Sequence, residues 1–427
     1  MGKNQEILCA IEFGTSKIGV MIGSVDSNQN LQVEGFCSIP SINSVVKGEI
    51  CDMNKATELL EKAINQADPD NLLSQCQEIV VLVTGSNITA KIESITTIVK
   101  NPQRIIDSVI LQEAHDNINF LHRQHEDRKI ISFIDLYHEV EGRRLRNALN
   151  QHCSQFTSYF YAIYVSENRL KNFTQVVKDT DIFEKEDFDI AFSTVASAFG
   201  ILSPSERDSG VILIDIGAGT TSYLVEEDNL ISTIGMIQIG FDHVINDLSI
   251  GLSLPFEYCR RILENGDITK AIDNNEEYFE ENSNRVGTPR KIPVSSITTI
   301  IDCRINEIYD VILKKITSSS ETSLTTLKSG GILTGGGAKF NRCKELFQNK
   351  FGMDCLVRGP ANVQGGEREI QCPRFSALWG GLHIAKTFST LNSPVKTVWH
   401  KKMIDSFSGM IPNSTKAIKQ FLKSIRL

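Results

Sequence analysis

Three glycine-rich stretches of the chain carry the residue types that bind phosphate groups. The first covers residues 12–17, after the apolar run 7–11, and the second covers residues 215–221, after the apolar run 211–214. The third covers residues 330–338 and contains three consecutive glycines. Glycine lets backbone N–H groups approach a phosphate closely, and threonine hydroxyls add donors. Taken alone, each stretch is equally compatible with an ordinary glycine-rich turn.

Charged side chains accompany the first two stretches. Asp215 closes the apolar run before the second one, where a carboxylate would hold hydrated Mg²⁺ beside phosphate oxygens. Lys17 closes the first stretch and would reach the phosphates as a point charge. These residues predict a site for a magnesium-bound polyphosphate.

The elements that must position these residues follow from the apolar pattern. Residues 7–11 and 18–25 read as the two strands of one hairpin, and residues 211–214 and 220–225 as the strands of another. The third stretch reads as a strand that enters the triple glycine, followed by a helix at 339–347. One hairpin therefore lies in each half of the chain.

Three such elements in this order resemble the phosphate-1, phosphate-2 and adenosine motifs of the superfamily of actin, the heat-shock ATPases and the sugar kinases. The resemblance implies an α/β protein with a duplicated actin-like (RNase H-like) ATPase fold, in which two related lobes hold ATP. It implies that Mg²⁺ is held through water by Glu12 and Asp215. The nucleotide-binding residues that it implies are Gly14, Thr15, Ser16, Lys17, Asp215, Gly217, Gly219, Thr220, Thr221, Gly240, Gly335, Gly336 and Gly337.

The overall composition is that of an ordinary globular protein. The chain has 427 residues, a hydrophobic content of 41% and a net charge of −8. This length favours two or three domains, and this charge does not predict nucleic-acid binding. The 10 cysteines form no C-x-x-C pair, which favours reduced thiols in a cytoplasm. No apolar run reaches the ~20 residues that span a bilayer, and we expect neither a signal peptide nor myristoylation.

An inserted region narrows the family. Residues 86–165 follow the strand expected at 78–84 and combine expected strands at 88–99, 129–140 and 156–165 with a helix at 102–121. An insertion at this place resembles the FtsA family of bacterial cell-division proteins, as do residues 10–17, 239–248 and 331–338. The expected division is a first lobe (1A) at 1–85 and 166–209, an SHS2-like subdomain (1C) at 86–165, a second lobe (2A/2B) at 210–386, a linker at 387–415 and a terminal helix at 416–427.

Several expectations concern the remaining helices. The apolar run 188–202 predicts a helix that connects the two lobes, and residues 374–382 resemble the second connecting helix. The superfamily resemblance implies that a helix at 254–266 binds ribose and adenine through Glu257 and Arg261, although a solvated helix face explains these charges as well. We expect a loop at 267–285 and a long helix at 296–316, whose isoleucines recur at helical spacing.

Two further groups of residues carry expectations about binding. Arg290 and Arg304 match basic positions in the part of FtsA that docks the acidic C-terminal peptide of FtsZ, the tubulin-like ring GTPase, whereas ordinary surface charge is the alternative. His122 and His125 lie in a charged stretch, which we read as a solvated loop because no third metal ligand is evident.

The end of the chain has its own pattern. Residues 416–427 form a basic amphipathic helix, which predicts contact with acyl chains on one face and with anionic headgroups on the other. The alternative is a helix that packs back on its own domain. The apolar residues are Ile418, Phe421, Leu422 and Ile425, and the basic residues are Lys416, Lys419, Lys423 and Arg426.

Together these features predict an FtsA-like protein on the cytoplasmic face of the bacterial inner membrane. Its family would polymerise head to tail, anchor the FtsZ ring and recruit later division proteins. We expect weak hydrolysis, because Glu12 replaces an aspartate, Ala218 a glycine and Ser222 a second aspartate of many relatives. A type IV pilus scaffold resembling PilM and a sugar-kinase-like phosphotransferase are the alternatives.

Overall fold

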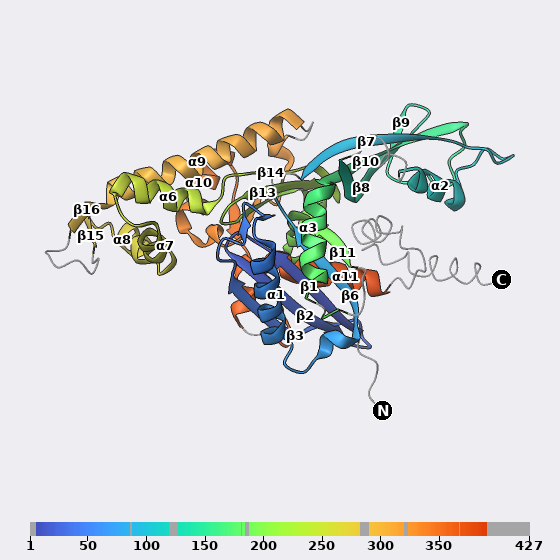
Figure 1. Ribbon diagram of the computed structural model, residues 1–427. Helices are drawn as coiled ribbons and strands as arrows, with labels where there is room; N and C mark the ends of the chain where they lie inside the picture. The colour runs from blue at the N-terminus through green and yellow to red at the C-terminus, as the bar shows by residue number, and fades with distance from the viewer. Residues whose placement is uncertain are drawn as a thin grey trace.

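Two sheets with the same strand order form the body of the protein in this computed structural model (Figure 1). The structure describes residues 6–85, 88–118, 127–180, 182–183, 188–281, 290–319, 323–366 and 368–390. The first sheet has the order β11-β6-β1-β2-β3 and comprises β1 (Glu6–Phe13), β2 (Lys17–Val25), β3 (Leu31–Pro40), β6 (Cys76–Val83) and β11 (Asp189–Phe192). The second has the order β14-β13-β12-β17-β18 and comprises β12 (Val211–Ile216), β13 (Thr221–Glu227), β14 (Leu230–Ile237), β17 (Gly331–Thr334) and β18 (Cys355–Val357).

The two sheets repeat one topology. In each, three consecutive strands form an antiparallel meander and two later strands add in parallel beside its first strand. β1 and β12 occupy the centre, and their continuous apolar sequences suit strands that are covered on both faces. The duplicated fold predicted from the sequence is therefore confirmed.

Helices cover both sheets. The first sheet packs against α1 (Met53–Ala67) and α3 (Glu167–Lys178) on one side, and against α4 (Ser193–Ile201) and α11 (Ser376–Thr390) on the other. α1 begins at Asp52, whose carboxylate accepts a hydrogen bond of 3.0 Å from the Lys55 N–H. The second sheet packs against α6 (Phe241–Leu252), α9 (Val294–Ser319) and α10 (Asn341–Phe351).

Smaller elements complete the described residues. α5 (Pro204–Ser209) follows α4, and a short hairpin of β4 (Val45–Val46) and β5 (Glu49–Ile50) precedes α1. α7 (Phe256–Glu264), α8 (Asp267–Asp273), β15 (Tyr278–Glu281) and β16 (Arg290–Pro293) lie at one side of the second lobe (Figure 1). The 3-10 turns are Leu72–Gln75, Leu324–Thr326, Gly337–Lys339, Arg368–Gln371 and Pro373–Phe375.

The inserted region forms a separate antiparallel sheet on the opposite side of the molecule from α7 and α8 (Figure 1). Its strand order is β7-β10-β8-β9, and α2 packs against it. The elements are β7 (Thr89–Ile98), α2 (Ser108–Ile118), β8 (Arg128–Val140), β9 (Arg143–Leu145) and β10 (Gln155–Ser166).

Three expectations about elements are wrong. Residues 189–192 form β11 rather than the start of a helix, because they complete the edge of the first sheet beside β6. Residues 267–273 form α8, which buries Ile268 and Ala271, so the segment expected as a loop is partly helical. α11 continues to Thr390, past the expected start of the linker at residue 387.

Other expectations lie outside the described residues. These concern His122, His125 and the entire terminal helix at 416–427. Within the described part of the chain, no helix combines the length and the apolar sequence needed to cross a membrane.

Candidate functional site

The tips of two hairpins, β1–β2 and β12–β13, have the same turn. The N–H of Gly14 donates to the Lys17 carbonyl at 2.8 Å, and the N–H of Gly217 donates to the Thr220 carbonyl at 2.9 Å. Each turn follows a central strand of its sheet. The sequence repeat seen in the two glycine-rich stretches thus corresponds to a repeat of backbone geometry.

The two tips touch each other. A Cβ atom placed on Gly219 would lie 2.6 Å from the Thr15 hydroxyl oxygen and 3.0 Å from the Lys47 Cα. Glycine is therefore needed at position 219, because any side chain would push the two lobes apart. The structure brings together the residues predicted on both tips.

The start of α6 supports the second tip from behind. The N–H groups of Phe241 and Asp242 donate to the carbonyls of Gly217 and Ala218 at 2.8 and 2.9 Å. A Cβ on Gly240 would lie 2.4 Å from the Ala218 oxygen, so Gly240 permits this contact. Gly240 lies behind the tip and holds its shape.

Asp215 lies beneath the tips at the end of β12. The Ser197 hydroxyl on α4 donates to its carboxylate at 2.8 Å. Loss of water around the carboxyl group raises the pKa of Asp215 to about 6, and the charge of Glu12 acts in the same direction. The Ser197 hydrogen bond and the charge of Lys17 oppose this rise. A cation bound next to Asp215 would therefore stabilise the ionised form of its carboxyl group.

Lys17 forms an ion pair with Glu12 and is only 5% exposed. Its ammonium group also lies 5.5 Å from the centre of the Phe375 ring. The ammonium group therefore lies at the junction of the first tip and the turn before α11. To contact a phosphate, the Lys17 ammonium group would have to break its ion pair with Glu12 or to bind the phosphate and Glu12 together.

The glycines after β17 differ in their surroundings. Gly335 has a φ of 86°, and a Cβ there would lie 2.4 Å from the Asp215 carboxylate. A Cβ on Gly337 would lie 2.7 Å from the Ile216 side chain. A Cβ on Gly336, by contrast, would lie no closer than 3.9 Å to a neighbouring atom, the Arg374 Cβ. Of the three glycines, only Gly336 is exposed and has room for a group placed above its backbone.

The structure adds residues to the site that the sequence analysis missed. Ser197 contacts Asp215 from a different lobe, Phe375 lies against Lys17, and Lys47 touches the second tip. None of them belongs to a glycine-rich motif. The Lys47-Gly48 pair has φ values of 49° and 74°, as in a type I′ hairpin turn. The glycine at position 48 was the sequence signal for this turn.

Glu257 and Arg261 lie on the solvent-facing side of α7. The Glu257 side chain is 81% exposed, and Arg261 stacks on Tyr258 at 5.2 Å. The neighbouring Arg260 points to α6, where it pairs with Asp242 at 3.3 Å. The structure places neither predicted residue in contact with the tips.

Arg290 and Arg304 have partners within the second lobe. Arg290 donates to the Leu252 carbonyl at 2.8 Å, and Arg304 donates to Asp247 at 2.6 Å and to Glu307 at 2.5 Å. A groove of about 600 Å³ runs along α9 nearby and includes the carboxylates of Asp302, Glu307 and Asp310. This groove is not a basic one.

Comparison with known proteins identifies the relatives. Residues 212–380 match the family model of cell division protein FtsA. The resemblance of this chain to the FtsA family is confirmed. Cell division protein FtsA of Buchnera aphidicola is 23% identical over 405 residues, which cover 91% of this chain and 93% of that protein. The protein of the same name from Borreliella burgdorferi is 24% identical over 417 residues, which cover 94% and 97%.

Solved structures support the fold of this chain. The PilM-PilN type IV pilus biogenesis complex contains a chain that matches with a TM-score of 0.60 and 12% identity, over 89% of this chain and 98% of that one. MreB5 of Spiroplasma citri bound to ADP matches with a TM-score of 0.51 and 12% identity, over 91% and 99%. At this identity the likeness concerns the fold alone.

Proposed function

We propose that this chain is an actin-like cell-division protein that binds ATP between its two lobes. The observation that carries the proposal is the contact between the two hairpin tips, with Asp215 beneath them and an open space at Gly336. Backbone N–H groups and hydroxyls of Gly14–Ser16 and Gly217–Thr221 would hold the phosphates. Gly335–Gly337 would lie beneath the base, and Glu257 and Arg261 would reach the ribose after a movement of α7.

The carboxylates fit a magnesium ion. Mg²⁺ keeps several waters and takes few protein ligands, and Asp215 with Glu12 offers two carboxylates beside the tips. Bound Mg²⁺ would neutralise phosphate charge. Glu12 and Asp215 would orient its waters, and Lys17 would pair with a phosphate oxygen.

Hydrolysis is proposed to be weak. Fast phosphoryl transfer to water needs a side chain that positions the attacking water. Glu12 stands where many relatives carry an aspartate, and Ser222 stands where many relatives carry a second acid. We therefore expect nucleotide to control assembly into head-to-tail filaments rather than to be turned over rapidly.

The proposed partners are the inner membrane, later division proteins and the C-terminal peptide of FtsZ. The tail residues 416–427 would attach the protein to the inner membrane from the cytoplasm, and later division proteins would join the assembled filament. The FtsZ peptide would dock near Arg290 and Arg304, where each arginine would exchange an internal partner for an acidic side chain. The named sequence relatives are cell-division proteins, which supports this role over a pilus scaffold or a sugar kinase.

Titration with a fluorescent ATP analogue tests the central claim. The full chain should bind it, and Gly336→Trp should abolish binding by filling the open space while the melting temperature stays within a few degrees. Gly251→Ala on α6, where a Cβ would meet only the flexible end of the Ile300 side chain, serves as the control for glycine replacement. Unchanged affinity in Gly336→Trp would place the nucleotide elsewhere. Phosphate release that is rapid and independent of protein concentration would contradict weak hydrolysis.

A further inference from the structure

The inserted subdomain contacts the second lobe at a buried tyrosine and, nearer to solvent, through an ion pair of 3.1 Å between Arg146 and Asp228. Tyr161 lies on β10 of the inserted sheet and is 5% exposed. Its hydroxyl donates to the backbone carbonyl of Ser232 on β14 at 2.5 Å. Around this bond, β8 packs against β14, and their residues Ile134 and Ile231 belong to the same buried cluster. The insert is therefore joined to the second lobe by a polar bond within an apolar contact.

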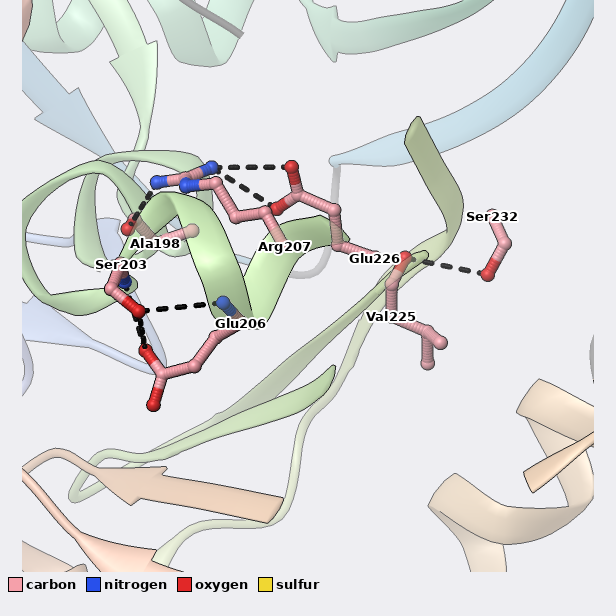
Figure 2. A network of polar contacts seen from close by, with 7 residues as sticks. All are labelled: Ala198, Ser203, Glu206, Arg207, Val225, Glu226 and Ser232. Atoms are coloured by element: carbon pink, nitrogen blue, oxygen red, sulfur yellow. Dashed lines mark hydrogen bonds and ion pairs between the residues drawn. The ribbon is translucent and has the colours of Figure 1, made fainter. Parts of the chain in front are cut away.

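Ser232 is the extra residue of a β-bulge. Thr233 pairs with Val225 and Ile231 pairs with Glu226, so the strand pairing with β13 skips Ser232. A bulge disrupts the ladder locally and changes the direction of the backbone. The Ser232 hydroxyl donates a hydrogen bond of 3.4 Å to the Val225 carbonyl (Figure 2). The Ser232 carbonyl accepts the hydrogen bond of the Tyr161 hydroxyl.

Opposite the bulge, a buried ion pair connects β13 with α5. Glu226 is 0% exposed and accepts hydrogen bonds of 3.3 and 3.0 Å from Arg207 (Figure 2). The same guanidinium donates to the Ala198 carbonyl of α4 at 2.6 Å. A buried pair of this kind is costly to break, because each charge would be left without a partner. Ala198 follows Ser197, which holds Asp215 at the site.

The first lobe holds the insert at its other end. Arg169 lies in the first turn of α3, which follows β10, and pairs with Glu49 of the β4–β5 hairpin at 2.9 Å. The neighbouring Gly48 donates to the Thr15 hydroxyl at 3.1 Å, and its carbonyl would lie 3.0 Å from a Cβ on Gly85. The first-lobe residues that flank the insert, Gly85 and Arg169, are thus both packed against the β4–β5 hairpin, which contacts the first tip.

We propose that the inserted subdomain is a brace between the lobes, with Tyr161 as its attachment to the second lobe, and that it favours the arrangement in which the two tips touch. Fixed to the first lobe near Thr15 and to the second at Ser232, the insert resists any rotation that separates Thr15 from Gly219. A ligand that requires touching tips therefore binds more tightly when the brace is intact, and linkage makes the effect reciprocal. This second part rests on the proposed ATP site.

Hydrogen exchange tests the brace without any ligand. Tyr161→Phe removes the hydroxyl and keeps the ring, so exchange at β14 and at both tips should rise several-fold. Tyr159→Phe is the matched control, because Tyr159 lies on the same strand and stacks on Tyr137 at 4.7 Å within the insert. Equal exchange at β14 in the two variants would overturn the brace.

Nucleotide titration tests the coupling. Tyr161→Phe should weaken binding of the fluorescent ATP analogue about threefold to fivefold, as loss of one hydrogen bond permits, and Tyr159→Phe should change it less than twofold. Unchanged affinity in Tyr161→Phe would overturn the coupling. Failure of the unaltered chain to bind the analogue, with increased exchange in Tyr161→Phe, would instead reject the proposed function and leave the brace supported.

Discussion

At the scale of single residues, Asp215 shows how the folded chain sets the charge of a carboxyl group. Desolvation raises its pKa to about 6, from an ordinary value of 3.8. The folded protein therefore binds an additional proton here between about pH 4 and 6. Without ligand, this group contributes stability below about pH 4, and the contribution is lost as the pH rises through 6. A cation reverses that preference, because it binds only the ionised form.

Magnesium-dependent nucleotide binding should therefore weaken in acid. At pH 5, about nine-tenths of Asp215 is protonated, given a pKa of about 6. We expect the Mg²⁺-dependent part of the affinity to fall roughly tenfold between pH 7.5 and pH 5. Nucleotide titrations at both pH values, with and without Mg²⁺, measure this change. Asp215→Asn should lose the difference, and an equally steep profile in that variant would assign the titration to the nucleotide.

The residue scale also shows what the sequence alone could predict. Gly219 and Asp215 could be found because a close approach and a strand-end carboxylate leave local patterns. Ser197 could not, because its contact with Asp215 depends on how α4 crosses the second sheet. The ion pair of Lys17 with Glu12 could not be foreseen either, since a lysine beside a phosphate-binding turn favours solvent or phosphate equally well.

At the scale of elements, local patterns predicted the long apolar strands and failed at short or polar segments. Residues 190–192 are apolar like the helix that follows them, and only pairing with β6 makes residues 189–192 a strand. α8 was missed because a stretch with many acidic and polar residues hides two buried side chains, Ile268 and Ala271. The first two strands of each meander, by contrast, follow directly from its hairpin signal.

Close packing of α4 on α11 is the second feature at this scale. A Cβ on Gly380 would lie 1.7 Å from the Ala196 carbonyl oxygen, and one on Gly200 would lie 2.8 Å from the Gly380 nitrogen. No rotamer relieves a clash between a Cβ and backbone atoms. The two helices approach this closely only because glycine is present on both.

Gly380→Ala should therefore force the helices apart. We expect the free energy of unfolding to fall by about 3 kcal/mol, at the upper end of overpacking costs. Urea unfolding followed by circular dichroism measures it. Gly251→Ala on α6 is the control, because its Cβ would meet only the flexible end of Ile300; its cost should stay below about 0.5 kcal/mol. Equal stabilities for the two variants would show that the helices can separate freely.

At the scale of the whole molecule, a body of negative net charge is combined with a basic terminal segment. The chain carries a net charge of −8, whereas residues 416–427 contain four basic residues and no acidic one. An anionic membrane would therefore repel the body and attract the tail. Filament formation would strengthen this attraction, since many weak tails on one polymer bind together.

Reversing the tail charges separates membrane attachment from folding back on the body. Replacing Lys416, Lys419 and Lys423 by Glu removes at least about 3 kcal/mol of attraction to anionic vesicles, at about 1 kcal/mol per basic residue. Co-sedimentation should therefore weaken about 100-fold or more. Replacing the exposed Lys62, Lys314 and Lys328 by Glu makes the same charge change on the body, and vesicle binding of this control variant should change far less. If the tail instead packs on the acidic body, its reversal lowers the melting temperature while vesicle binding stays unchanged, and the membrane role is rejected.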